Sequence, residues 1–386
     1  MSKLQQFLVA DSSTLANFIA WGSAISAALA GMTGLWTQTN DTGQAVWTQT
    51  VLSISATAQS GSNTIFTYTL TSGPALRVGM SITTTNCGTN NNLTGTITAL
   101  GSGTFTVANA TGTTQTGLSG SGSTTVVTLP ATGTVGATEF WAMSDSLAST
   151  CPLVMKIQYG RTAGSAPYLA FTFGATTNGA GTLFGNVTPT YSNPQLSGSS
   201  PSGTGSALYE CDFSWASGRF GMLLWRDLGG AATIFLGIER SLNSSGSYTG
   251  SYVTVLGVGM NNNSNSSGPF QLTVPALGTG GPVAIGIVAT GYNTNNCAWA
   301  TINWFGPTVY AGSAAVSPVF PMIGYFDNPV TVAVTMKASD QAEGANFSAT
   351  LYGTAHNYLF TKSGNFNYLM PSGANGGVSG MGMRWE

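Results

Sequence analysis

The run Phe66-Thr67-Tyr68-Thr69-Leu70-Thr71, within residues 64–71 (TIFTYTLT), alternates large apolar side chains with threonine. Successive side chains of a β-strand point to opposite faces, so this period of two predicts a strand with one buried face. Further short strands are predicted at residues 80–83, 95–100 and 104–108, with turn residues between them. Several short strands at this spacing predict a small all-β unit over residues 51–131, a sandwich or a barrel, and we expect a small inserted β-sandwich. The glycine- and serine-rich residues 117–124 are either a hairpin or a linker.

Residues 137–386 carry stronger strand signals and form the predicted main domain. Eight apolar or alternating runs lie at residues 153–159, 169–173, 220–225, 233–240, 252–256, 283–288, 330–335 and 347–352. Clusters of Gly, Asn and Pro separate them, and no strand alternates with a long helix, which argues against a parallel α/β sheet. We therefore expect a mainly β protein whose larger domain is an antiparallel, jelly-roll-like β body.

The N-terminal segment, residues 1–50, is predicted to contain the one good helix and to act as a docking segment. Ser12, Ser13 and Thr14 offer oxygen atoms for an N-cap, and apolar residues then recur at a mostly helical period. Gly31 and Gly34 can end the helix. Because the helix has almost no charged face, we expect it to be buried at a contact between subunits or with another component of an assembly. The candidate assembly contact consists of Phe18, Trp21, Ile25 and Leu29.

The tetrapeptide Trp-Thr-Gln-Thr occurs at residues 36–39 and again at residues 47–50. Between the two copies lies Asn40-Asp41-Thr42-Gly43, which is typical of a turn. With a single recurrence the pattern indicates a pair of similar strands and not a solenoid.

The charge content is the most unusual property of the composition. The 386 residues are 42% hydrophobic but only 6% charged, with 10 Lys+Arg, 12 Asp+Glu and a net charge of −2. A surface this poor in Lys and Arg is unsuited to nucleic acid or to an anionic membrane surface. A free soluble monomer normally carries more charge, so we infer that other chains cover much of the surface and expect a homo-oligomer, most simply a homotrimer.

No run of apolar residues is long enough for a transmembrane helix, so no membrane insertion is expected, and residues 1–6 do not resemble a signal peptide.

Catalytic and metal-binding motifs are not evident, and we expect no enzyme activity, no cofactor and no metal site. Cys87, Cys151, Cys211 and Cys297 are far apart in sequence and are predicted to be buried free thiols, with one disulfide as the alternative. The single histidine, His356, lacks a serine in a nucleophile-elbow context and is expected to be structural.

One pair of carboxylates could suit a glycosidase. Glu210 and Asp212 would share one face of a strand. The alternative, which we favour, is an outward polar face paired with Arg219, Arg226 or Arg240.

Two polar segments of the main domain are candidates for contact with a polysaccharide surface. One is the loop at residues 261–268, and the other contains Tyr292, Asn293, Asn295 and Asn296. Amides donate and accept hydrogen bonds at once, as the hydroxyls of a polysaccharide require, and an aromatic ring can stack on a sugar. The alternative is that these loops only connect strands or fill gaps between subunits.

Two stretches resemble a family of structural proteins of tailed-bacteriophage virions. The first covers residues 18–29 and 36–44, and the second covers residues 139–147 and 152–160. Residues 69–80 are similar to an Ig-like insertion found in phage virion proteins. The resemblance implies a virion component that is assembled in the host cytoplasm, contacts other virion proteins and carries no catalytic residues to transfer. We expect a surface appendage such as a tail fibre or spike; the alternatives are a head-decoration protein and, less favoured, a polysaccharide depolymerase.

Overall fold

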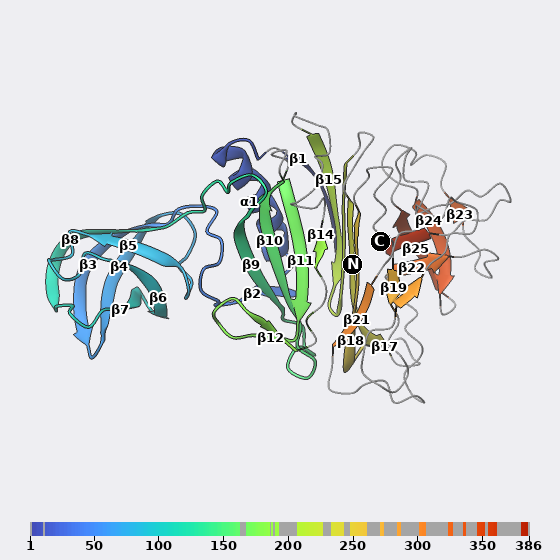
Figure 1. Ribbon diagram of the computed structural model, residues 1–386. Helices are drawn as coiled ribbons and strands as arrows, with labels where there is room; N and C mark the ends of the chain where they lie inside the picture. Colours follow the sequence, from blue (N-terminus) through green and yellow to red (C-terminus); the bar gives the residue numbers. More distant parts are fainter. Residues whose placement is uncertain are drawn as a thin grey trace.

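The computed structural model describes residues 2–10, 12–162, 167–185, 187, 190–192, 207–226, 233–242, 248–260, 271–273, 284–286, 301–305, 323–326, 335–336, 346–351, 354–360 and 380–384. Within these residues the chain forms one α-helix and strands that are almost all antiparallel, so the prediction of a mainly β protein with an N-terminal helix is confirmed. Figure 1 shows a barrel at one end of the molecule beside a body of stacked sheets.

Helix α1 spans Leu15–Ala30 and begins where the capping residues predict. The Thr14 hydroxyl accepts a hydrogen bond from the Asn17 amide at 3.2 Å, and Gly31 follows the last turn as the C-cap. The buried side of α1 faces the main body of the protein, which it contacts through β1 and β2. In the part of the chain that the structure describes, no helix has the length and apolar content needed to cross a membrane.

Two facing sheets form the main body. The larger has the order β1-β15-β16-β17-β18-β21-β19-β20 and the smaller the order β14-β11-β10-β9-β2. The larger comprises β1 (Ser2–Ala10), β15 (Ala207–Ala216), β16 (Arg219–Arg226), β17 (Thr233–Leu242), β18 (Tyr248–Met260), β21 (Thr301–Phe305), β19 (Gln271–Thr273) and β20 (Ala284–Gly286). The smaller comprises β14 (Tyr191–Ser192), β11 (Pro167–Gly174), β10 (Val154–Arg161), β9 (Val135–Met143) and β2 (Trp36–Gln38). Consecutive strands such as β15 to β18 are neighbours in one sheet, so each of the two sheets is a meander. In a jelly roll, which was expected, consecutive strands alternate between the two sheets.

The core of the body lies between these two sheets and α1. Alternate residues of each strand point into it, as the period of two requires. On the larger sheet these residues include Cys211, Phe213, Phe220, Met222, Leu236 and Ile238, and on the smaller sheet Met155, Ile157, Tyr159, Phe171 and Phe173. Helix α1 adds its apolar face to the same cluster, so helix and sandwich share one core.

Two smaller sheets complete the described part of the body. A hairpin joins β12 (Thr176–Thr177) to β13 (Leu183–Phe184). A five-stranded antiparallel sheet comprises β22 (Ile323–Phe326), β26 (Gly380–Arg384), β25 (Thr354–Phe360), β24 (Asn346–Leu351) and β23 (Thr335–Met336).

The inserted unit is a closed six-stranded barrel. A sandwich of two separate sheets was expected here, but each strand pairs with a neighbour on both sides, so the sheet has no free edge. Its strands, in order around the barrel, are β3 (Val51–Ser60), β4 (Asn63–Ser72), β7 (Thr104–Ala108), β6 (Thr94–Gly101), β5 (Ser81–Thr85) and β8 (Gln115–Thr124). Register shifts in β3 and in β6 bend the sheet, which helps it to close. The barrel has its own core, in which Phe66 and Phe105 stack at 4.8 Å.

The glycine-rich residues 117–124 lie in strand β8, which pairs with both β3 and β5 and closes the barrel. Gly120 and Gly122 of this strand are buried. A Cβ on Gly120 would lie 2.6 Å from the Cys87 sulfur, so no larger residue fits there without displacing the cysteine. The small residues are therefore required by the narrow barrel interior and do not mark a linker.

Candidate functional site at the junction of barrel and sandwich

A buried carboxylate, Glu139, lies where the barrel joins the sandwich. On strand β9 the side chains of Ala137, Glu139, Trp141 and Met143 point to the same, core-facing side. Glu139 is 1% exposed, although its neighbours on this face all belong to the apolar core. A buried carboxylate is costly unless hydrogen bonds compensate for the lost water, so Glu139 requires donors within the core.

Five side chains from five segments donate hydrogen bonds to Glu139. Oε1 accepts from the Ser26 hydroxyl of α1 at 2.7 Å, from the Trp47 indole nitrogen at 2.9 Å and from the Gln38 amide of β2 at 3.5 Å. Oε2 accepts from the Tyr159 hydroxyl of β10 at 2.7 Å and from the Trp141 indole nitrogen of β9 at 3.3 Å. The carboxylate therefore ties the helix, three strands of the smaller sheet and the connection that leads into the barrel to one point.

The ionisation of this cluster follows from its burial. Burial raises the pKa of Glu139 above its usual value, and the donated hydrogen bonds from Ser26, Tyr159 and the two indoles oppose that rise. The pKa of Tyr159 lies well above its usual value, first because the phenol is buried and then because the Glu139 charge is close. Tyr159 is therefore a neutral donor at physiological pH. Because the Glu139 side chain is 1% exposed, the carboxylate joins these segments together and is not presented at the surface.

Arg77, in the loop between β4 and β5, is the only charged residue of the chain between Asp41 and Glu139. The side chain is half-buried, and its Nη2 donates a hydrogen bond to the carbonyl oxygen of Ala45 at 3.3 Å. Burial lowers the pKa of Arg77, while the negative charge of Glu139 raises it. The single charge of the barrel is thus turned toward the sandwich, and its electrostatic partner is the buried carboxylate.

Asp41 fixes a second contact between segments that are distant in the sequence. Its carboxylate, 1% exposed, accepts hydrogen bonds from the Thr39 hydroxyl at 2.6 Å and the Thr177 hydroxyl at 2.7 Å. It also accepts from the Gly181 amide at 3.0 Å. The turn at residues 39–44 is therefore fastened to the β12–β13 hairpin.

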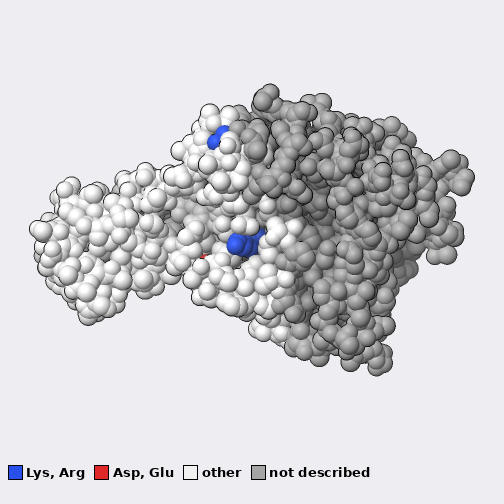
Figure 2. Space-filling model, viewed as in Figure 1, with Lys and Arg blue, Asp and Glu red and all other residues white. Residues whose placement is uncertain are grey.

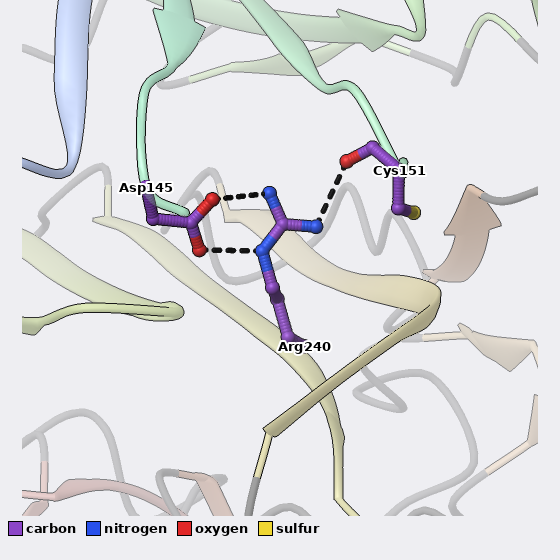
Figure 3. A network of polar contacts seen from close by, with 3 residues as sticks. All are labelled: Asp145, Cys151 and Arg240. Atoms are coloured by element: carbon purple, nitrogen blue, oxygen red, sulfur yellow. Dashed lines mark hydrogen bonds and ion pairs between the residues drawn. The ribbon is translucent and has the colours of Figure 1, made fainter. Parts of the chain in front are cut away.

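A buried ion pair connects the smaller sheet to the larger one. Arg240 of β17 binds Asp145, in the loop after β9, through two parallel contacts of 2.5 and 2.6 Å. Figure 3 shows the guanidinium between Asp145 and the main chain of Cys151, whose carbonyl oxygen accepts the third hydrogen bond at 2.8 Å. Both charged side chains are 1% exposed or less, so the pair is fully enclosed between the sheets.

The four candidate assembly residues are buried in the core of this chain. Phe18, Trp21, Ile25 and Leu29 are 0, 1, 0 and 1% exposed and pack in the core of the sandwich. The uncharged circumference that suggested a contact between subunits is explained on this side by burial against the chain's own sheets. These four side chains therefore present no surface to a partner in this structure.

The other residues that the sequence singled out are only partly described. Tyr292, Asn293, Asn295, Asn296 and the loop at residues 261–268 lie outside the described residues, as does Cys297. Cys87, Cys151 and Cys211 are buried free thiols, as predicted. His356 lies on β25, opposite Ala349 of β24.

The expectation of an outward acidic face on β15 is wrong for Asp212. Its side chain is 0% exposed, although it lies on the face of β15 opposite to that of the core residues Cys211 and Phe213. Arg240, considered as a surface partner for this face, is instead buried against Asp145. Asp212, one of the two carboxylates considered for a glycosidase, is therefore enclosed in this structure, and the side chain of Glu210 lies outside the described ones.

The residues of the junction were not identified from the sequence. The alternation of Ala137, Glu139, Trp141 and Met143 contains the signal, because it puts one carboxylate on an otherwise apolar strand face. The isolation of Arg77 in a long uncharged segment is a second signal. The partners from α1 and from the connection at Trp47 depend on the tertiary fold and leave no local pattern.

Comparison with known proteins adds no relative: no family model, no curated protein and no solved structure matches this chain. Among the described residues, no group of three or more His, Cys, Asp or Glu side chains is placed to hold a metal ion.

Proposed function

We propose that this chain is a structural component of a bacteriophage virion and forms a surface appendage, a tail fibre or spike, by oligomerisation. The observation that carries the proposal is the scarcity of ionised groups on the described surface, where Lys3 is exposed and Lys156, Arg161 and Arg219 are half-buried. Among carboxylates whose side chains the structure describes, Asp41, Glu139, Asp145 and Asp212 are all buried. Figure 2 shows the barrel without a charged residue on the face in view. Such a surface suits a protein that works inside a symmetric assembly and not as a dispersed monomer.

The architecture is compatible with this role. A β-sandwich that carries a barrel at one end exposes a small folded unit at a distance from its base (Figure 1). The resemblance of residues 18–29, 36–44, 139–147 and 152–160 to phage virion proteins points to the same class. A head-decoration protein is the second candidate, because a neutral projecting barrel suits an ornament on a capsid equally well. A polysaccharide depolymerase is less favoured, since Asp212 is enclosed.

The proposal is tested on purified particles. An antibody raised against the barrel, residues 51–124, is expected to label intact virions in electron microscopy, and mass spectrometry should find this chain in them. Label on the tail supports an appendage, and label on the capsid supports head decoration. Absence of the chain from purified particles, with the protein abundant in the infected lysate, would reject a virion role.

Oligomerisation and host contact have separate tests. Sedimentation of the purified chain is expected to give a homotrimer, and a stable monomer at all concentrations would contradict that part of the proposal. A role of residues 292–296 in binding a host polysaccharide predicts that Tyr292→Ala with Asn293→Ala lowers adsorption of assembled particles. Unchanged adsorption, with normal assembly, would remove these residues from host recognition.

A further inference from the structure

The first connection between sandwich and barrel contributes side chains to both cores. Ala45 and Trp47 are buried in the core of the sandwich, whereas Val46, between them, is buried in the core of the barrel. Three successive residues therefore alternate between two domains. A segment anchored in this way has no free length in which to bend.

The second connection repeats this arrangement. Val126 packs against the barrel core, and Val127 packs against the sandwich core. The amide of Val127 donates a hydrogen bond to the carbonyl oxygen of Val46 at 3.0 Å, so the two connections are paired to each other. Together they act as one two-stranded support and not as two independent linkers.

The loop between β4 and β5 adds a third contact from the barrel side. The Thr50 hydroxyl donates to the Pro74 carbonyl oxygen at 2.8 Å. Gly79 has a φ of +90°, and a Cβ there would lie 2.6 Å from the Asp41 carbonyl oxygen. The loop thus packs directly on the backbone of the turn at residues 39–44, and only glycine allows this approach.

Arg77 belongs to the same loop and is its only charged member. It donates to the Ala45 carbonyl oxygen and interacts electrostatically with Glu139. Glu139 also accepts a hydrogen bond from the indole nitrogen of Trp47, in the first connection. The charge of the barrel and the connection that leads into it therefore converge on one carboxylate of the sandwich.

We infer that this junction is a rigid coupling that holds the barrel in one orientation relative to the sandwich, with Arg77 as its positioning residue. Domains joined by ordinary linkers move relative to one another by default. Here the alternating connections remove the slack, and the contacts of Arg77 select one orientation. The coupling gives the barrel a fixed direction on whatever assembly carries the sandwich.

The test measures orientation in the full-length protein. Spin labels on Ser62→Cys, at the exposed turn between β3 and β4, and on Ala20→Cys, on the exposed side of α1, report the distance between barrel and body. The background carries Cys297→Ser, because Cys87, Cys151 and Cys211 are buried. Labelled protein is diluted with unlabelled protein, so that distances within one chain dominate in an oligomer. The expected result is a single narrow distance distribution.

Arg77→Met keeps the aliphatic length of the side chain and removes its charge and hydrogen bonds. This variant is expected to give a broad or bimodal distribution with an unchanged circular dichroism spectrum, and Gly79→Ala should do the same by lifting the loop from Asp41. Thr98→Ala, on the exposed face of β6, is the control and should keep the narrow distribution. A narrow, unshifted distribution in both Arg77→Met and Gly79→Ala would overturn the inference, and a broad distribution in the unsubstituted background would also overturn it. If Arg77→Met does not fold, Gly79→Ala decides the outcome.

Discussion

The indole ring of Trp47 occupies the space that a side chain on Gly22 would fill. A Cβ on Gly22 would lie 2.0 Å from the ring atom Cη2, and the same ring meets Phe18 and Tyr159 edge to face. Helix α1 therefore receives the connection to the barrel at the one position of its buried face that has no side chain. The helix, the connection and β10 are locked together by this single ring.

Replacing Gly22 by Ala is expected to destabilise the protein. The ring of Trp47 must shift, which costs about 1–3 kcal/mol by overpacking, with a further loss if its hydrogen bond to Glu139 breaks. Gly31→Ala is the matched control, because its Cβ would meet only ordinary contacts of 3.4 Å at a helical φ of −72°. That substitution should be neutral or stabilise by about 0.4–1 kcal/mol. Urea unfolding of both variants gives the comparison; equal effects would contradict the steric argument.

The hydrogen bond from Trp47 to Glu139 can be separated from ring packing by comparing two tryptophans. Trp36 is also buried and packs edge to face on Phe220, but its indole nitrogen has no hydrogen-bond partner among the described residues. Trp47→Phe and Trp36→Phe remove the same atoms from the same core. We expect Trp47→Phe to lower the free energy of unfolding by about 1–3 kcal/mol more than Trp36→Phe, because it removes one of the five hydrogen-bond donors of a buried carboxylate. Equal losses in chemical denaturation would mean that this hydrogen bond contributes nothing.

The raised pKa of Glu139 predicts a pH dependence of stability with a definite sign. The folded state holds the proton more tightly than the unfolded state, whose carboxyl group titrates near 4.5. The stability from this group is therefore complete below 4.5 and is lost as the pH rises through the higher pKa of the folded state. Glu139→Gln, which cannot titrate, lacks this loss.

The measurement is the free energy of unfolding of both proteins at a series of pH values on both sides of 4.5. The difference between them removes the contribution of all other carboxylates, including Asp41, Asp145 and Asp212. We expect the native protein to lose stability relative to Glu139→Gln as the pH increases. A difference that stays constant over the series would contradict the assignment.

The sequence predicted the elements better than their arrangement. The hydroxyl groups before Leu15 predicted the start of α1, and the alternation of residues 66–71 predicted strand β4, because both signals are local. The second Trp-Thr-Gln-Thr copy was expected to be a strand, but residues 47–50 are an irregular connection. There the ring of Trp47 enters the sandwich core while the backbone passes to the barrel, and this depends on contacts with distant residues. Barrel closure likewise depends on the register shifts in β3 and β6, and no local sequence pattern predicts these shifts.

The burial of charge in the body was the least predictable feature. Asp145 and Arg240 are far apart in sequence, and each is an ordinary surface residue by type. Their pairing requires β17 of the larger sheet to face the loop after β9, which only the sandwich brings about. The enclosed guanidinium donates hydrogen bonds to Asp145 and to the Cys151 carbonyl oxygen, so removal of either charge leaves the other without its ion-pair partner.

This mutual dependence predicts non-additive effects on stability. Asp145→Leu or Arg240→Met alone is expected to lower the free energy of unfolding by about 3–5 kcal/mol, because an unpaired charge remains buried. The double variant Asp145→Leu/Arg240→Met replaces the pair by apolar side chains and should cost clearly less than the sum of the single losses, since the desolvation of both charges also disappears. Chemical denaturation of the four proteins forms a complete thermodynamic cycle. Strictly additive losses would show that the two side chains act independently, and the ion pair would then not be what joins the loop after β9 to the larger sheet.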